Sequence, residues 1–343
     1  MARAVVSYSV AHTVVPTYFC FNRCTYCTFR QDGALALIGA DAVAAELRAA
    51  RAQDVCEILV LSGEVHPRSA QRESWFKTVL NVCDQALKHG MLPHTNVGPL
   101  SWAEMDQLAH VNASMGLMLE STSPALQLKG GPHFRAPSKD VALRKQQLEQ
   151  AGKLRVPFTT GLLLNIGEHR ERDTRDSLQY IAQVHREYSH IQEIILQPFQ
   201  PGQSSRAETS SADQRSPMTP RMSEIDAEYL FETVRLARAL LPESVAIQVP
   251  ANLMDLGQIV QCVELGASDL GGLGIVRDEV NPLYAFPSMS SLSNALAVRG
   301  FQLGMRLPVH KSFYSWCRSA RVSELVREWH ERIQQSATLL HVP

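Results

Sequence analysis

The sequence predicts an α/β protein: a single (β/α)8 TIM-type barrel, or a partial barrel, with a C-terminal helical extension. Eight strand candidates alternate with helix candidates along the chain. Most of the strand candidates, such as residues 57–61, are unbroken apolar runs, as in parallel sheets that helices cover on both faces. Eight such units make a closed barrel the simplest arrangement.

The alternation can be followed from the N-terminus. The first strand is expected in the apolar segment 13–19 directly before Cys20. Asp41 is expected to cap the next helix, which runs to about residue 53. Ser101 and Glu104 have the spacing of a capping box, which predicts a helix start. Further strands are expected at residues 57–61, 92–96, 113–119, 156–164, 191–196, 245–249 and 268–270. Further helices are expected over residues 73–88, 140–152, 171–187, 224–241, 256–265, 289–298 and 322–335.

One segment interrupts this alternation. Residues 200–224 lack apolar periodicity and are rich in Ser, Pro, Gln and Thr, so we expect a flexible loop there. We expect residues 1–310 to form one barrel domain and residues 311–343 to form a helical tail that packs on it.

Composition limits the kinds of partner. The chain has 33 basic and 34 acidic residues, and this balance gives no long-range attraction to nucleic acid or to an anionic membrane. We see neither a charged-then-apolar leader nor an apolar run of membrane-spanning length. The seven cysteines show no paired spacing outside one loop, which favours a reducing compartment. We therefore expect a cytoplasmic protein with a small-molecule ligand.

Cys20, Cys24 and Cys27 form the most informative motif, C-x3-C-x2-C. Thiolates this close together can converge on one soft metal centre, and four-iron clusters are held by cysteine sulfur. Three ligands leave one iron without a protein ligand, and an open position lets a metal bind a substrate. The loop follows the first expected strand, so it should lie at the end of the barrel where active sites form.

These cysteines could instead bind structural zinc or form a disulfide. A structural zinc site would need a fourth ligand, usually from a second Cys or His pair, and the remaining cysteines provide no such pair. A disulfide with one spare thiol is disfavoured because nothing at the N-terminus resembles a secretory signal. An open cluster is the favoured interpretation.

The cysteine loop resembles that of the radical S-adenosylmethionine (SAM) enzymes, in which the open iron is chelated by the amino and carboxylate groups of SAM. The resemblance implies a [4Fe-4S] cluster on Cys20, Cys24 and Cys27, with SAM beside it. It also implies that turns at strand ends contact SAM and that an arginine forms two hydrogen bonds with the SAM carboxylate. These residues are Ser62, Gly63, Glu64, Glu120, Arg144, Gly161, Gly167 and Glu168. Taken singly, each could equally be a turn, a helix cap or a solvated charge.

Longer segments give a narrower resemblance. Residues 93–96, 113–123 and 247–253 are among those that look like the CofG subunit of the FO synthases, and the likeness runs from about Tyr8 to Val309. FO is 7,8-didemethyl-8-hydroxy-5-deazariboflavin, made on the way to coenzyme F420. The resemblance implies a radical lyase and cyclase that closes the deazaflavin ring of a hydroxybenzyl-ribityliminouracil adduct with loss of ammonia. The adduct would come from a companion CofH-type subunit, and the electron from a donor such as ferredoxin or flavodoxin.

A uracil ring and a ribityl chain require neutral donors and acceptors, so amides at strand ends are the natural substrate ligands. The candidates are Asn96, Gln197, Gln248, Asn252 and Asn281. For the catalytic base, His133 is the first candidate, and Tyr8 and His94 are its rivals. Each of these residues is also common in loops or in plain packing.

Two further functions stay open at this point. The first is another radical SAM enzyme of the same branch, such as the CofH-type subunit or a menaquinone-pathway enzyme. The second is a non-catalytic iron-sulfur or zinc protein. This second function is disfavoured because such a protein would not need the Ser62–Glu64 turn, Arg144 and the 161–168 segment in register with strand ends.

Overall fold

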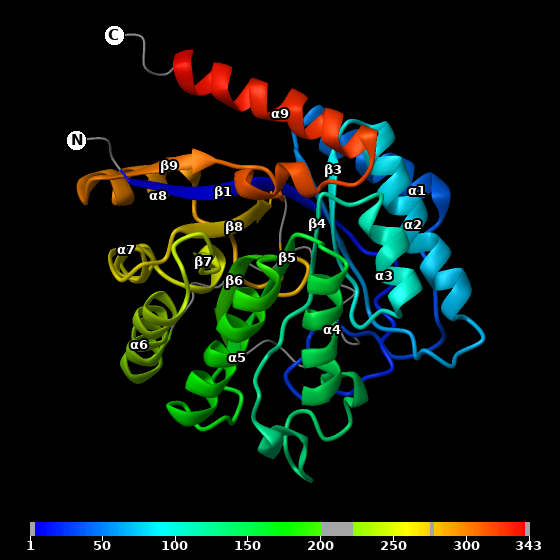
Figure 1. Cartoon of the computed structure of the whole chain (residues 1–343), viewed down its shortest axis with the longest axis horizontal. Coiled ribbons are helices and arrows are strands. Elements are labelled where there is room, and N and C mark those ends of the chain that lie inside the picture. Colours follow the sequence, from blue (N-terminus) through cyan, green and yellow to red (C-terminus); the bar gives the residue numbers. More distant parts are fainter. Residues whose placement is uncertain (1–3, 201–221, 275–277, 340–343) are drawn as a thin grey trace.

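Eight parallel strands close into a barrel in the computed structural model, which describes residues 4–200, 222–274 and 278–339 (Figure 1). Each strand from β2 to β7 pairs with the next, and β1 pairs with both β8 and β2, so the barrel is closed. The predicted TIM-type fold is confirmed. The strands are β1 (Ala4–Val14), β2 (Glu57–Leu61), β3 (Leu92–Asn96), β4 (Ser114–Gly116), β5 (Phe158–Leu164), β6 (Ile191–Pro198), β7 (Ala246–Gln248) and β8 (Asp269–Gly274).

Helices surround the barrel (Figure 1). The main core lies between the outward strand faces and the apolar faces of these helices, where Leu47, Val60 and Val79 are fully buried. The helices of this layer are α1 (Ala40–Ala52), α2 (Arg72–Lys88), α3 (Trp102–Ala109), α4 (Val141–Lys153), α5 (Arg172–Tyr188), α6 (Glu224–Leu240), α7 (Leu256–Glu264) and α8 (Met289–Val298). Every helix in the described residues is too short or too polar to be a membrane span.

The first residues of α1 and α3 show whether the two predicted helix caps form. Ser101 and Glu104 form the expected capping box, with the Ser101 hydroxyl accepting from the Glu104 backbone N–H and the Glu104 carboxylate accepting from the Ser101 backbone N–H. The cap predicted at Asp41 is wrong. Helix α1 begins at Ala40 after Gly39, and Asp41 lies in the first turn, where a carboxylate still interacts favourably with the helix dipole.

The structure adds a ninth strand that the sequence did not predict. Strand β9 (Phe301–Met305) pairs in parallel with residues 4–8 of β1, while residues 11–14 of β1 pair with β2. The length of β1 therefore lets one edge carry two neighbours in succession. Strand β9 was missed because its side chains are only partly buried and Gly304 interrupts its apolar pattern.

The segment after β9 covers the N-terminal end of the barrel. Leu307, Phe313 and residues of α9 (Ala320–Leu339) pack in one cluster with Cys56 and Leu92, which lie at the starts of β2 and β3. Helix α9 lies across the outside of the barrel (Figure 1). The segment expected as a tail from residue 311 therefore shares a core with the barrel strands. Residues 201–221 of the loop expected at 200–224 lie outside the described residues.

The packing of α9 generates a prediction for stability. Leu325 is 1% exposed, so Leu325→Ala should lower the free energy of unfolding by about 2–5 kcal/mol through lost apolar contact and a residual cavity. The matched variant Leu128→Ala removes a side chain that is 67% exposed, and should change stability by less than about 0.5 kcal/mol. Urea unfolding followed by circular dichroism measures both variants. Equal stability of the two would contradict the packing described here.

Candidate active site

The cysteine loop leaves the C-terminal end of β1 and lies against the turn that follows β2. The Phe21 backbone N–H donates to the Glu64 carbonyl (3.0 Å), and the Gly63 N–H donates to the Thr17 carbonyl (2.8 Å). A Cβ atom on Gly63 would lie 1.9 Å from the Phe19 carbonyl oxygen, so only glycine permits this contact. The two loops are therefore held together backbone to backbone.

Cys20, Cys24 and Cys27 line one pocket of about 240 Å³ at the mouth of the barrel. Carboxylate, amide and cationic side chains share this pocket with them. From the predicted SAM-binding set, the pocket contains Ser62, Gly63, Glu64, Glu120 and Arg144. The structure thus brings together the cysteines and five of the eight residues that the sequence assigned to SAM.

Arg144 and Glu64 form a buried ion pair at one side of the pocket. Arg144 is 2% exposed and donates to the Glu64 carboxylate (3.2 Å) and to the carbonyls of Ser138 and Met118. The Asn22 amide also donates to Glu64 (3.0 Å). Three of the five guanidinium N–H groups are used in these contacts, so two remain for a ligand.

Glu120 pairs with Lys139 on the other side of the pocket. Burial by itself would raise the pKa of Glu120, but Lys139 and Arg144 outweigh it and hold that pKa below its usual value. Glu120 also has a φ of +67°, a left-handed conformation that costs energy in a residue other than glycine. In this conformation the charged Glu120 carboxylate lies at the wall of the pocket.

The remaining predicted SAM contacts lie apart from the cysteines. Gly161 is in the barrel wall, where a Cβ atom would lie 2.2 Å from the Ile195 carbonyl oxygen. Glu168 turns back on its own loop and accepts from the backbone N–H groups of Asn165 (2.6 Å) and Ile166 (2.8 Å). Gly167 and Glu168 line a separate hollow.

A larger cavity of about 650 Å³ fills the interior of the barrel. All five amides predicted to bind substrate line it: Asn96, Gln197, Gln248, Asn252 and Asn281. Asn96, Gln197 and Asn281 also line the cysteine pocket, so the two spaces share a wall.

The three candidates for the catalytic base occupy different places. His94 lines the interior cavity, and burial lowers its pKa to about 4. His133 contacts the hydroxyl of Tyr26, which lines the cysteine pocket, but His133 lines neither cavity. Ser7 and Ser9 bond to carboxylates inside the barrel, so Tyr8 between them faces outward.

Several pocket residues were not found from the sequence. Asn22, Tyr26 and Lys139 all line the cysteine pocket. Tyr26 precedes Cys27 and could have been noticed in the motif. Lys139 ends a short 3-10 helix (Pro137–Lys139) that no sequence pattern indicated, and only the fold brings it beside Glu120.

The donor set fits an iron-sulfur cluster better than a single metal ion. Within the described residues, no three His, Cys, Asp or Glu side chains gather closely enough to hold one ion. A four-iron cluster takes each thiolate on a different iron, so its ligands need not meet at one point. Burial raises the pKa of the Cys24 thiol to about 11, and a bound cation would displace that proton.

Comparison with known proteins identifies the family of this chain. Residues 14–181 match the radical SAM superfamily model. The 7,8-didemethyl-8-hydroxy-5-deazariboflavin synthase of Synechococcus elongatus is 48% identical over 309 residues, which cover 90% of this chain and 87% of that protein. The synthase of Gloeobacter violaceus is 46% identical over 337 residues, 98% of this chain and 99% of its own. The chain belongs to the FO synthase family of the radical SAM superfamily.

Solved structures with low sequence identity support the fold alone. The FeFe-hydrogenase maturase HydG from Carboxydothermus hydrogenoformans superposes with a TM-score of 0.66 at 14% identity, covering 88% of this chain and 68% of that one. Methylornithine synthase (PylB) gives a TM-score of 0.62 at 13% identity, covering 92% and 86%. The role rests on the sequence relatives instead: this FO synthase family member is a radical SAM enzyme of deazaflavin synthesis, and the superfamily implies a [4Fe-4S] cluster and SAM.

The cysteine assignment can be tested by matched variants. Cys24→Ala should abolish the visible absorbance of the cluster and all SAM cleavage, because the cluster would lose one of three protein ligands. Cys83→Ala should keep both, since Cys83 is buried beside Thr95 and Asn112, in the layer between the barrel and its helices. Absorbance after anaerobic reconstitution and chromatography of 5'-deoxyadenosine are the measurements. Equal losses in the two variants would count against the assignment.

Proposed function

We propose that this chain closes the deazaflavin ring of a hydroxybenzyl-ribityliminouracil adduct with loss of ammonia, as a radical SAM lyase and cyclase. One observation carries the proposal: the cysteine pocket and the amide-lined cavity share Asn96, Gln197 and Asn281. A reactive group formed in the pocket would face a substrate in the cavity without crossing solvent. The names of the relatives, which are synthases of FO, support this choice of product.

The cysteine pocket would hold both cofactors. Cys20, Cys24 and Cys27 would bind a [4Fe-4S] cluster, and SAM would occupy the open iron. Together these cofactors would supply one-electron cleavage of SAM and a carbon radical that removes hydrogen from the substrate. Glu64 would accept hydrogen bonds from the SAM amino group, and the free N–H groups of Arg144 would hold its carboxylate.

The 161–168 segment would contact the adenosine part of SAM. Its backbone would make this contact. The Glu168 carboxylate accepts hydrogen bonds from the Asn165 and Ile166 backbone N–H groups and so fixes the conformation of the loop. The Tyr229 hydroxyl donates to Glu168 (3.0 Å) and supports the same loop from α6. Glu168 would thus position the loop, and the backbone at Gly161 and Gly167 would allow close approach.

The substrate would bind through uncharged groups. An interior cavity whose lining includes the five predicted amides offers donors and acceptors at once, which suits the edges of a uracil ring. A substrate bound between the barrel strands would displace water from the cavity, which would protect a radical from side reactions.

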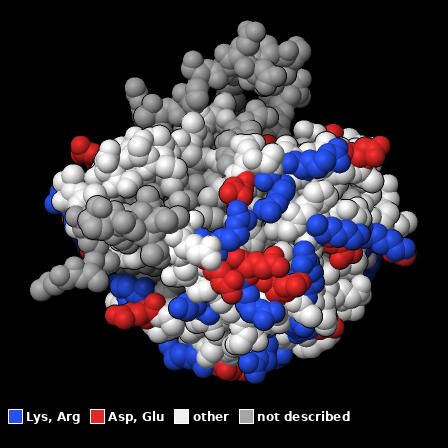
Figure 2. Space-filling model, turned by 90° about the horizontal axis from the view of Figure 1, so that it is seen from above, with Lys and Arg blue, Asp and Glu red and all other residues white. Residues whose placement is uncertain are grey.

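The proposal includes two partners. A companion CofH-type enzyme would supply the adduct, and a small donor such as ferredoxin or flavodoxin would supply the electron. Nucleic acid is not expected as a partner. On the face shown in Figure 2, basic and acidic side chains are interspersed and form no large field of one sign.

The decisive experiment uses anaerobically reconstituted protein with dithionite, SAM and the product of the companion enzyme. We expect fluorescent deazaflavin, 5'-deoxyadenosine and one ammonium ion for each deazaflavin formed. The Cys24→Ala variant is the control and should give none of these products.

Each other result has a distinct meaning. SAM cleavage without deazaflavin would indicate a different radical SAM reaction of the same branch. Absence of cleavage would indicate a non-catalytic protein, and deazaflavin without ammonium would contradict the lyase step.

A further inference from the structure

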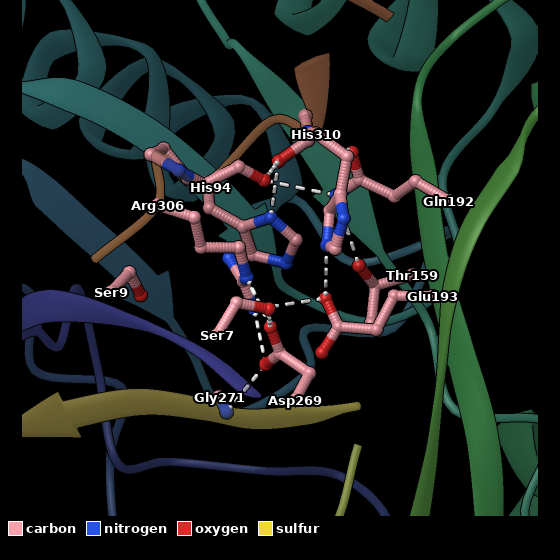
Figure 3. A network of polar contacts seen from close by, with 12 residues as sticks. Ser7, Ser9, His94, Thr159, Gln192, Glu193, Asp269, Gly271, Arg306 and His310 are labelled. Atoms are coloured by element: carbon pink, nitrogen blue, oxygen red, sulfur yellow. Dashed lines mark hydrogen bonds and ion pairs between the residues drawn. The ribbon is translucent and has the colours of Figure 1, made fainter. Parts of the chain in front are cut away.

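Two networks of charged side chains border the barrel interior. Toward the N-terminal ends of the strands, Arg306 donates to Asp269 (2.7 Å) and to Glu193 (3.1 Å), as Figure 3 shows. At the opposite end, Arg144 donates to Glu64 (3.2 Å), and both of these residues line the cysteine pocket. The geometry of the second network therefore bears directly on the proposed SAM site.

Glu64 is held by the protein at both carboxylate oxygens. Oε1 accepts from Arg144 (3.2 Å), and Oε2 accepts from the Asn22 amide (3.0 Å). An oxygen of a carboxylate has two acceptor positions, so each oxygen keeps one for a ligand. The Glu64 side chain is 12% exposed, in contrast to the 2% of Arg144, and it lines the cysteine pocket. The carboxylate is thus fixed in place and still open to a donor.

Asn22 is buried in the cysteine loop, where it is 2% exposed. Its Oδ1 atom accepts from the Ser138 backbone N–H (3.1 Å), and its Nδ2 atom donates to Ser138 Oγ (2.7 Å) and to Glu64. A backbone N–H can only donate, so the amide oxygen must face Ser138. This requirement directs the NH₂ group of Asn22 toward the Glu64 carboxylate.

These contacts close into a ring of hydrogen bonds. Arg144 Nε donates to the Ser138 carbonyl (2.8 Å), while another nitrogen of the same guanidinium donates to Glu64. The ring therefore runs from Asn22 through Glu64, Arg144 and Ser138 back to Asn22. Its members come from the cysteine loop, the turn after β2, α4 and the segment before α4. No member can shift without breaking two of these contacts, so the ring restrains each side chain.

Gly98, in the loop after β3, gives the Glu64 side chain its space. A Cβ atom on Gly98 would lie 2.5 Å from both Cγ and Cδ of Glu64. The φ of Gly98 is +85°, in the left-handed region that favours glycine. Any side chain at this position would therefore displace the Glu64 side chain from the conformation that the ring requires.

We infer that Asn22 and Gly98 are positioning residues, which fix the Glu64 carboxylate for the amino group of SAM. The inference rests on the SAM site of the proposed function. Asn22 orients the carboxylate with a hydrogen bond, and Gly98 leaves room for it. Without them, SAM binding would have to order the Glu64 side chain, and that ordering lowers affinity.

The test measures SAM affinity by isothermal titration calorimetry in the full-length, reconstituted enzyme. The cluster is kept oxidised, so that no electron is available to cleave SAM. Two ligands are compared, namely SAM and the analogue in which hydrogen replaces its amino group. The single variants are Asn22→Leu, Gly98→Ala and Glu64→Gln, and each of the first two is also combined with Glu64→Gln. Cluster absorbance is recorded for every variant.

We expect Glu64→Gln to weaken SAM binding about 10- to 100-fold, the usual effect of losing hydrogen bonds to a charged group. Asn22→Leu and Gly98→Ala should each weaken it about 3- to 10-fold, the cost of ordering one side chain. Binding of the analogue should change less than about twofold, because it has no amino group. Each double variant should bind SAM within about twofold of Glu64→Gln, since residues that act through one group are not additive.

Asn112→Leu is the matched control. Asn112 is also a buried amide, 3% exposed, and its Nδ2 atom lies 3.6 Å from Cys83 Sγ. It lies outside the lining of both the cysteine pocket and the interior cavity. This variant should bind both ligands as the wild type does, which separates the loss of a buried amide from the loss of the contact with Glu64.

Three results would overturn the inference. The first is unchanged SAM binding in Glu64→Gln or in both Asn22→Leu and Gly98→Ala. The second is an equal loss for SAM and the analogue, which would indicate a purely structural role. The third is a double variant whose losses multiply, since Asn22 or Gly98 would then act without Glu64.

Two features keep the outcome clear. Gly98 lies outside the cysteine loop, so Gly98→Ala decides the question if Asn22→Leu fails to hold its cluster. The proposed function is judged separately, by deazaflavin formation in the wild type, and the comparison of the two ligands does not depend on that product.

Discussion

The close contact between the cysteine loop and the turn after β2 is the constraint on which the site depends. The backbones touch at Gly63 and Phe19, and no side chain could fit between them. This contact directs Glu64 into the pocket, where Arg144 balances its charge. Because a buried charge without its partner is costly, the pair also fixes the position of α4 relative to the loop. The pocket is thus assembled from β1, β2 and α4 together.

The barrel interior provides the second part of the site. Barrel interiors of this class are usually filled with side chains, whereas here small residues such as Ala11 and Gly272 help to leave a cavity of about 650 Å³. The segment after β9 covers the N-terminal end of the barrel, so the cavity has a floor. Amides near the cysteine pocket and the charged side chains of Glu57, Glu193 and Arg306 near the floor give the cavity two chemically different ends.

Most regular elements followed from local patterns, although strand β1 (Ala4–Val14) lies almost entirely before the predicted segment 13–19. Strands β2 and β3 match the predicted ranges, and the Ser101 cap formed as expected, because apolar periodicity and capping act over a few residues. The cap at Asp41 failed because Gly39 and Ala40 already begin the helix. Strand β9 was missed because its partly buried side chains and Gly304 give no strand pattern, and only its pairing with β1, almost 300 positions away, identifies it.

The sequence by itself determined the barrel, the three-cysteine motif and the family, since each is encoded in residue types and short spacings. Only the tertiary structure decided which side chains share a space. It placed Lys139 beside Glu120, separated Glu168 from the cysteines, and joined Asn96 to both cavities. The physical reason is that loop conformation and the closure of the sheet set these distances, and both depend on packing between remote segments of the chain.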